Sequence, residues 1–324
     1  MIEKREPQPF FIVGAPRSGT TLAKALLRSV EGVYVLPEEF QLLRPFLEMV
    51  AEQRSQQQVV NLLTGSAFAT HLKRRGIFPS EEAIVERLRW NDPGAAFQDF
   101  VMLVRAEEGL PTPRYFGDKT PENVFQLDLI FRTWPNARVL VVVRDPRDTV
   151  RSMNKAWGRS WLRGSVVWRD AMAAALEHAA GRPSALHLIR YEDIVANPVD
   201  SIEHVASWLG VDWEPENVKV VKTEERWGQA AGASGVVARE SEWTESLDSR
   251  QVQLVESICF REMIALGYQP ELATTPRSPR RIRVVLATAH DGVAILRSYA
   301  RERGWREAIS YKLRQWMGGS RLTH

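Results

Sequence analysis

The sequence predicts an α/β fold, a doubly wound parallel sheet of the P-loop-like type that is flanked by helices. Short apolar runs alternate with longer helical stretches, and strands separated by helices form βαβ units with parallel pairing. The first apolar run leads into a glycine-rich loop and then into a helix. This order is typical of folds that hold a phosphate at a helix N-terminus.

Four segments are predicted to be strands. Residues 138–143 form the clearest one, because an unbroken apolar run is typical of a parallel strand that is covered on both faces. Residues 10–13 and 185–190 are the next strands, and residues 33–36 form a short strand that ends at Pro37.

Helices are predicted between and after these strands. The first covers residues 20–30, and Asp145 with Pro146 supplies the N-cap and first residue of a helix that continues over 147–156. Residues 38–110 are expected to be mostly helical. Two further helices are expected over 198–209 and 249–266, and they end at Gly210 and Gly267.

A domain boundary is expected near residue 270. Residues 1–270 are predicted to form one α/β domain, and residues 271–324 a basic amphipathic helical C-terminal extension that begins with the proline-rich linker 270–279. The extension holds 11 Lys and Arg against 4 Asp and Glu, a net charge of +7, whereas the whole chain carries +3. The first 270 residues therefore carry −4. That balance argues against a protein that binds nucleic acid.

The extension has an apolar stripe on an otherwise basic helix, made of Trp305, Ile309, Leu313 and Trp316. Such a stripe can pack on the domain or on a second subunit, or it can lie on an anionic membrane surface, and both alternatives stay open. No run approaches the roughly 18 apolar residues of a spanning helix. The first strand leaves no room for a signal peptide before it, and Cys259 is the one cysteine, so a cytoplasmic location is expected.

The loop between the first strand and the first helix has the Gly-x4-Gly spacing of a phosphate-binding loop, from Gly14 to Gly19. Backbone N–H groups and the positive end of the following helix point at an anion bound there. Thr20 stands where nucleotide kinases place their lysine, and a basic residue occurs earlier, as Arg17. The loop is therefore expected to hold a phosphate-like group without that lysine, unless its glycines serve only a tight turn.

A second anion site is predicted after the strand over 138–143. Arg144 follows this strand directly, and Ser152 lies eight residues later, about two turns along the next helix. Because ligands bind at the carboxyl ends of parallel strands, both anion sites should line one crevice. The alternative for Arg144 is an ion pair with Asp145 or Asp148.

These motifs resemble those of the PAPS-dependent sulfotransferases, which transfer a sulfuryl group from 3′-phosphoadenosine-5′-phosphosulfate (PAPS) and release PAP. The resemblance covers residues 10–193 and implies the sulfotransferase fold, PAPS as the donor, no metal ion and a hydroxyl-bearing acceptor. Four segments occur in the order of that family: Pro16-Arg17-Ser18-Gly19-Thr20-Thr21, Gly117-Asp118-Lys119-Thr120-Pro121, the stretch from Val142 to Ser152, and Arg190-Tyr191-Glu192-Asp193.

The resemblance also implies which residues hold the donor. The first loop looks like the 5′-phosphosulfate loop of the family, and Arg144 with Ser152 looks like its 3′-phosphate motif. Tyr191 matches a position that touches the nucleotide, although it also fits an ordinary tyrosine at a strand end. Ser234 is a candidate for the late loop that closes over the nucleotide, where this sequence lacks the Arg-Lys-Gly signature of the cytosolic enzymes. The implied donor-binding residues are Arg17, Ser18, Gly19, Thr20, Thr21, Arg144, Ser152, Tyr191 and Ser234.

The general base is assigned by the same resemblance. Cytosolic phenol and steroid enzymes place a histidine two residues after the lysine, but Pro121 occupies that position here. Tyrosylprotein and many bacterial carbohydrate-type enzymes use a glutamate shortly after the first helix, and this likeness points to Glu38, with Glu39 as the alternative. A carboxylate there can remove the proton of an acceptor hydroxyl. Arg17 and Lys119 would stabilise the charge on the sulfuryl oxygens.

Simpler interpretations stay open beside these. Glu38 can merely start a helix, and Lys119 can form a salt bridge to Asp118 or Glu122. For the whole chain, the alternatives are a P-loop kinase or NTPase and a catalytically inactive PAP-binding protein. The acceptor stays open among carbohydrates, lipids, peptide tyrosines and small molecules, because all of them present a hydroxyl.

Overall fold

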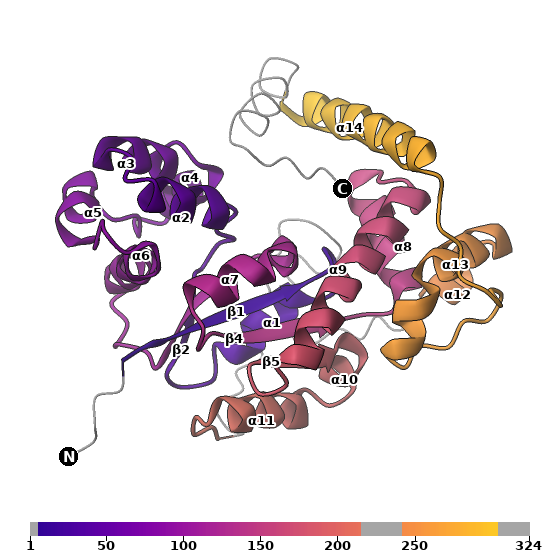
Figure 1. Cartoon of the computed structure of the whole chain (residues 1–324), viewed down its shortest axis with the longest axis horizontal. Coiled ribbons are helices and arrows are strands. Elements are labelled where there is room, and N and C mark those ends of the chain that lie inside the picture. Colours follow the sequence, from indigo (N-terminus) through magenta and orange to yellow (C-terminus); the bar gives the residue numbers. More distant parts are fainter. Residues whose placement is uncertain (1–5, 215–241, 304–324) are drawn as a thin grey trace.

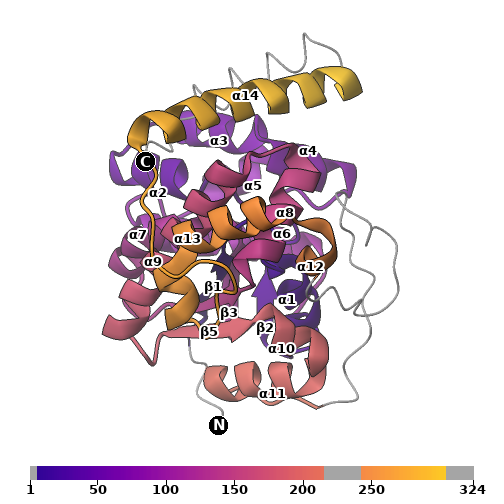
Figure 2. The ribbon, with the colours of Figure 1, turned by 90° about the vertical axis from the view of Figure 1, so that its right-hand side faces the viewer.

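A parallel β-sheet forms the centre of the molecule. The structure is a computed structural model that describes residues 6–214 and 242–303. Figures 1 and 2 show the sheet between helices. Within the described residues the sheet has five strands in the order β2-β3-β1-β4-β5, all neighbours being parallel, so the expected fold class is confirmed. The strands are β1 (Gln8–Gly14), β2 (Val33–Val35), β3 (Tyr115–Lys119), β4 (Arg138–Val143) and β5 (Leu186–Arg190).

Helices surround this sheet and form a further group at the left of Figure 1. The elements around the sheet are α1 (Thr20–Leu27), the 3-10 helix η1 (Pro121–Gln126), α7 (Leu127–Thr133), α8 (Pro146–Trp157), α9 (Trp161–Gly181), α10 (Tyr191–Ala196) and α11 (Pro198–Leu209). The separate group is α2 (Leu43–Ala51), α3 (Gln56–Thr64), α4 (Ala67–Arg74), α5 (Glu81–Arg87) and α6 (Pro93–Glu107). The C-terminal helices are α12 (Trp243–Ser246), α13 (Ser249–Ala265) and α14 (Arg281–Arg303).

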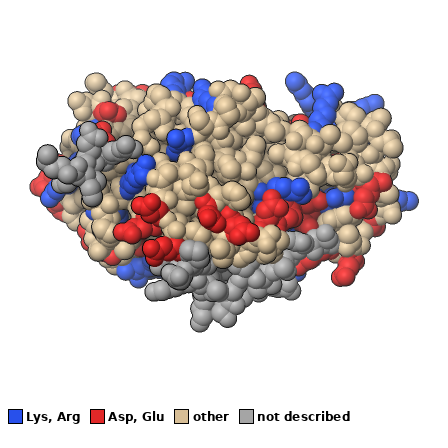
Figure 3. Space-filling model, turned by 90° about the horizontal axis from the view of Figure 1, so that it is seen from below, with Lys and Arg blue, Asp and Glu red and all other residues tan. Residues whose placement is uncertain are grey.

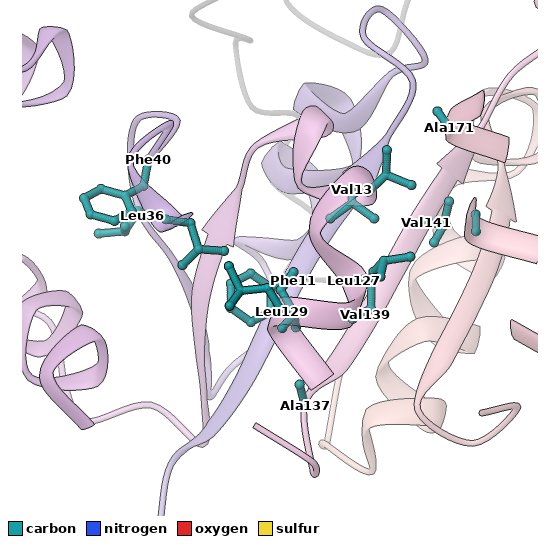
Figure 4. Packing of buried hydrophobic residues seen from close by; sticks show 14 of the residues in the cluster. Phe11, Val13, Leu36, Phe40, Leu127, Leu129, Ala137, Val139, Val141 and Ala171 are labelled. Carbon is teal, nitrogen blue, oxygen red and sulfur yellow. The ribbon is translucent and has the colours of Figure 1, made fainter. Parts of the chain in front are cut away.

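Side chains of the central strands alternate between the two faces of the sheet. Phe11 of β1 and Val139 of β4 pack with Leu127 at the start of α7 on one face (Figure 4). Phe10 of β1 and Leu140 of β4 belong to a second buried cluster, together with residues of α1, α10 and α11. Burial on both faces explains why these two strands read as unbroken apolar runs.

The sequence pattern did not predict β3, because Gly117, Asp118 and Lys119 interrupt any apolar run there. The neighbouring strand demands the glycine: a Cβ atom at position 117 would lie 1.7 Å from the carbonyl oxygen of Phe10. Residue 117 must therefore be a glycine, because the backbone of β3 lies so close to that of β1. The spacing of apolar residues along the chain does not indicate this contact.

A cluster of aromatic rings fixes the chain that directly precedes α2. The ring of Phe40 lies between 5.2 and 5.9 Å, centroid to centroid, from those of Phe46, Phe68, Phe97 and Phe100. Such contacts add to the free energy gained by burying each ring. The segment between β2 and α2 is thus held by α2, α4 and α6 rather than by regular structure of its own.

The start of α8 follows the prediction. Asp145 is the N-cap, and its Oδ1 atom accepts a hydrogen bond of 2.8 Å from the backbone N–H of Arg147. Pro146 is the first helical residue, where a missing N–H costs nothing. The strand β4 and this cap fix the direction in which the chain leaves the sheet.

A buried ion-pair network ties α8 to the C-terminal helices. The guanidinium of Arg147 binds both carboxylate oxygens of Asp145, and its Nη1 atom donates to Oε1 of Glu256 at 2.8 Å. The Glu256 carboxylate also accepts from the backbone N–H groups of residues 271–273 at 2.8 to 2.9 Å. The indole of Trp243 lies 3.9 Å below the same guanidinium. These contacts join α12, α13 and the segment after it to the sheet domain.

The C-terminal extension is described as far as α14, and the stripe from Trp305 to Trp316 lies outside the described residues. The boundary at residue 270 stays a prediction. Among residues 6–214 and 242–303, no helix is both long and apolar enough to cross a membrane. Cys259 and Trp168 are both fully buried in the core.

We expect Glu256→Gln to lower the free energy of unfolding by about 3–5 kcal/mol, because it removes the fully buried carboxylate partner of the Arg147 charge. Urea unfolding followed by circular dichroism measures the change. The matched control is Glu245→Gln on α12, where the side chain is exposed. Equal unfolding midpoints for the two variants would contradict the importance of this network.

Candidate functional site

The carboxyl ends of the parallel strands bring the predicted motifs together. The loop after β1 and the helix after β4 meet directly, since Nε of Arg17 donates a hydrogen bond of 3.3 Å to Oγ of Ser152 across 135 positions of sequence. The guanidinium carbon of Arg17 also lies 5.9 Å from the ring of Trp157, a contact that no sequence motif predicted. The two anion motifs thus share one edge of the sheet.

The loop after β1 has the backbone conformation of an anion-binding turn. Arg17 has φ of 70° and Gly19 has φ of 99°, both in the left-handed region. Gly19 is the N-cap of α1 and offers no capping side chain, so the first N–H groups of α1 stay open to a ligand. Oγ of Ser18 is buried without a hydrogen-bond partner among the described residues. A buried hydroxyl that no protein group satisfies fits an anion-binding loop.

A stack of side chains joins the loop to β4 and β5. The guanidinium carbon of Arg144 lies 4.2 Å from the ring centroid of Tyr191, the first residue of α10 after β5. A Cβ atom on Gly19 would lie 2.4 Å from the same ring, so only glycine fits there. The carbonyl of Arg144 accepts a hydrogen bond of 2.9 Å from Nε1 of Trp168. Arg144 and Tyr191 are therefore held in place by packing.

Lys119 connects the loop to Glu39, the alternative base. Its ammonium group, on a side chain that is 4% exposed, donates to Oγ1 of Thr21 at 3.2 Å and to Oε1 of Glu39 at 2.5 Å. Oε2 of Glu38 lies 3.5 Å from Nδ1 of His71 on α4. Both carboxylates are about one third exposed, so an acceptor can reach them. Lys119 thus forms its ion pair with Glu39, and not with Asp118 or Glu122, the two partners suggested by the sequence.

Lys24 of α1 is a buried residue of this site that sequence reasoning missed. Its Nζ atom donates to the carbonyl of Pro37 at 2.7 Å and to that of Leu36 at 3.4 Å, which anchors the chain just before Glu38. Burial, followed by the nearby charge of Lys119, lowers the pKa of the Lys24 ammonium to about 7. The available signal was a lysine in an otherwise apolar helix directly after the loop.

Asp118 holds the opposite side of the same segment. Its carboxylate accepts from the backbone N–H of Phe40 at 2.9 Å and from Nδ2 of Asn123 at 3.0 Å. Burial raises the pKa of the Asp118 carboxyl to about 6, although the Phe40 hydrogen bond opposes this shift. Asp118 therefore acts as a structural support for the glutamates.

Ser234 lies outside the described residues, so its predicted contact with the nucleotide stays a prediction. In the part of the chain that the structure describes, no group of three or more His, Cys, Asp or Glu side chains is arranged to hold a metal ion.

The raised pKa of Asp118 predicts how stability depends on pH. The folded chain holds this proton more tightly than the unfolded chain, so the stability it contributes is present below pH 3.8 and is lost as the pH rises through about 6. The free energy of unfolding of the parent chain, minus that of Asp118→Asn, should therefore fall by roughly 2–3 kcal/mol between pH 4 and pH 7. Urea unfolding at several pH values measures it. A difference that does not vary with pH would refute the assignment.

The comparisons with known proteins agree with this geometry. The model of the sulfotransferase family matches residues 9–215. Protein-tyrosine sulfotransferase 2 of Gallus gallus is 26% identical over 71% of this chain and 57% of its own length, and the protein-tyrosine sulfotransferase of Drosophila melanogaster is 24% identical over 82% and 52%. The chain thus spans about half the length of the curated relatives it matches.

A solved structure shares the fold. The sulfotransferase domain from the curacin biosynthetic pathway has a TM-score of 0.51 and 19% identity, covering 83% of this chain and 100% of that one. At that identity the likeness concerns the fold alone. Since the family model covers more than half of the sequence, this chain belongs to the sulfotransferase family, which confirms the family that its motifs predicted.

Proposed function

We propose that this chain transfers the sulfuryl group of PAPS to the hydroxyl of an acceptor by in-line displacement at the edge of the sheet. The observation that supports this most is the hydrogen bond between Arg17 and Ser152. It places two anion motifs side by side, and a donor with a phosphosulfate and a separate phosphate needs two such motifs at one site.

The residues present fit this donor. The N–H groups at the start of α1 and the unpaired hydroxyl of Ser18 would hold the phosphosulfate, helped by Thr20 and Thr21. Arg144 and Ser152 would bind the 3′-phosphate. Tyr191 would pack beside the nucleotide, and Ser234 is kept as a proposed further contact.

Arg17 and Lys119 would stabilise the transferring group. Both carry a positive charge at the loop. A preorganised positive charge that stabilises the negative charge of the transition state increases the reaction rate. Glu39 bonds Lys119 at 2.5 Å, so we assign it the task of positioning this ammonium.

Glu38 is proposed as the general base, and Glu39 is the alternative. Among the described residues, the carboxylate of Glu38 forms no ion pair with a lysine, and it lies 3.5 Å from Nδ1 of His71. It would take the proton of the acceptor hydroxyl as oxygen attacks sulfur and the bond from sulfur to the phosphate oxygen breaks.

The acceptor is proposed only as a class, a molecule with a free hydroxyl. Because both curated relatives described above are named protein-tyrosine sulfotransferases, a tyrosine in a peptide is the first acceptor to test. Carbohydrates, lipids and small alcohols are the others.

PAP binding tests the donor site. We expect Arg144→Ala to raise the Kd for PAP by about 10- to 150-fold, because the charge-assisted hydrogen bonds it removes are worth on the order of 1.5–3 kcal/mol. Isothermal calorimetry measures this, with Arg138→Ala at the other end of β4 as the control. An unchanged Kd would remove Arg144 from the site. Tighter binding of ATP with magnesium than of PAP would favour a kinase or NTPase instead.

The base is tested by a pair of variants with radiolabelled PAPS and a panel of acceptors. We expect Glu38→Gln to lower kcat by about 10²–10⁴-fold while the Kd for PAP stays the same. Glu39→Gln should retain more activity, since it alters a positioning contact. The reverse order would make Glu39 the base, and PAP binding without turnover by the parent chain would support an inactive binding protein.

A further inference from the structure

The first half of α14 presents an apolar stripe to solvent. Ile282, Val285 and Leu286 are 63%, 61% and 62% exposed. Their spacing of three and four residues places them on one side of the helix. We call this stripe the outer α14 face. In Figures 1 and 2 the helix runs along the outside of the molecule, so nothing described covers this face.

The opposite side of α14 is anchored, which fixes the outward direction of the stripe. Asp291 is 4% exposed, and its carboxylate accepts hydrogen bonds from the backbone N–H of Ser160 at 3.1 Å and from its Oγ at 3.3 Å. Val284 packs against the hydrophobic core. The helix therefore turns its inner side to α8 and α9 and cannot bury the outer α14 face by rotating.

The outer α14 face is bordered by positive charge. Arg281 and Arg283 are exposed and lie on either side of the stripe by the helical period, with Arg277 and Arg280 just before them. No Asp or Glu occurs from residue 272 to residue 290. The face of the molecule seen from below, away from α14, instead shows a band of Asp and Glu (Figure 3). The surroundings of the outer α14 face are thus basic, whereas the face seen from below carries acidic side chains interspersed with basic ones.

We propose that the outer α14 face docks on an anionic lipid surface. Apolar side chains enter the boundary between headgroups and acyl chains, while flanking arginines reach lipid phosphates, which is how basic amphipathic helices lie in an interface. Charge complementarity favours this partner over a second copy of the chain, because two copies of the face would bring their arginines together. Docking would hold the enzyme at a surface with its acidic face toward solvent.

The test uses the full-length chain and co-sedimentation with phosphatidylcholine vesicles that contain or lack phosphatidylglycerol. We expect binding to the anionic vesicles alone, and weaker binding as salt rises. Replacing Ile282 and Leu286 together by Ser should weaken it by about tenfold or more, since two exposed apolar side chains no longer enter the interface. Arg281→Gln should weaken it by about fivefold.

The matched control replaces Val199 and Ile264 by Ser, two exposed apolar residues on other helices. It should bind like the parent chain. Equal binding of the Ile282 and Leu286 variant and the parent, or no binding by the parent, would overturn the proposal. So would a parent dimer that this variant converts to a monomer in analytical ultracentrifugation without any vesicle binding, since the face would then be a subunit interface. Circular dichroism verifies that every variant is folded.

Discussion

The parallel pairing of β1 with both β3 and β4 is the constraint on which the site depends. Because the three strands run in the same direction, the loop after β1, the end of β3 and Arg144 after β4 emerge at one edge of the sheet. The close contact between Gly117 and the Phe10 carbonyl fixes the register of β3 against β1. That register places Lys119 at the end of β3, where its ammonium group contacts Thr21 and Glu39. The contact between Arg17 and Ser152 follows from the pairing of β1 with β4.

The fold retains polar groups at this edge that cost stability. Lys24 and Lys119 are both buried, and each is satisfied by specific partners: backbone carbonyls for Lys24, and Glu39 with Thr21 for Lys119. The hydroxyl of Ser18 is buried without a partner among the described residues. Buried polar groups are expensive unless they are paired. Their concentration in one place is typical of a functional site and would be unusual in a purely structural one.

The C-terminal helices hold α8, the helix that carries Ser152, in place. The family match ends at residue 215, yet Glu256 on α13 binds Arg147 in the first turn of α8, the helix that carries Ser152. The backbone N–H of Trp243 bonds Asp148 in the same turn at 3.0 Å. These later segments are therefore part of the same folded unit as the sheet, and they hold α8 in the position that Ser152 requires.

Local chemistry was enough to identify the parts of the molecule that rest on short-range rules. The apolar run of β4, the cap formed by Asp145 and Pro146, and the glycine spacing of the first loop each act within a few residues, so one sequence reveals them. Contacts between distant elements were a different matter. Lys119 pairs with Glu39 across 80 positions of sequence, and neither β3 nor the anchoring by Lys24 left a clear pattern. Such pairs depend on the order of strands in the sheet, and spacing along the chain does not encode that order.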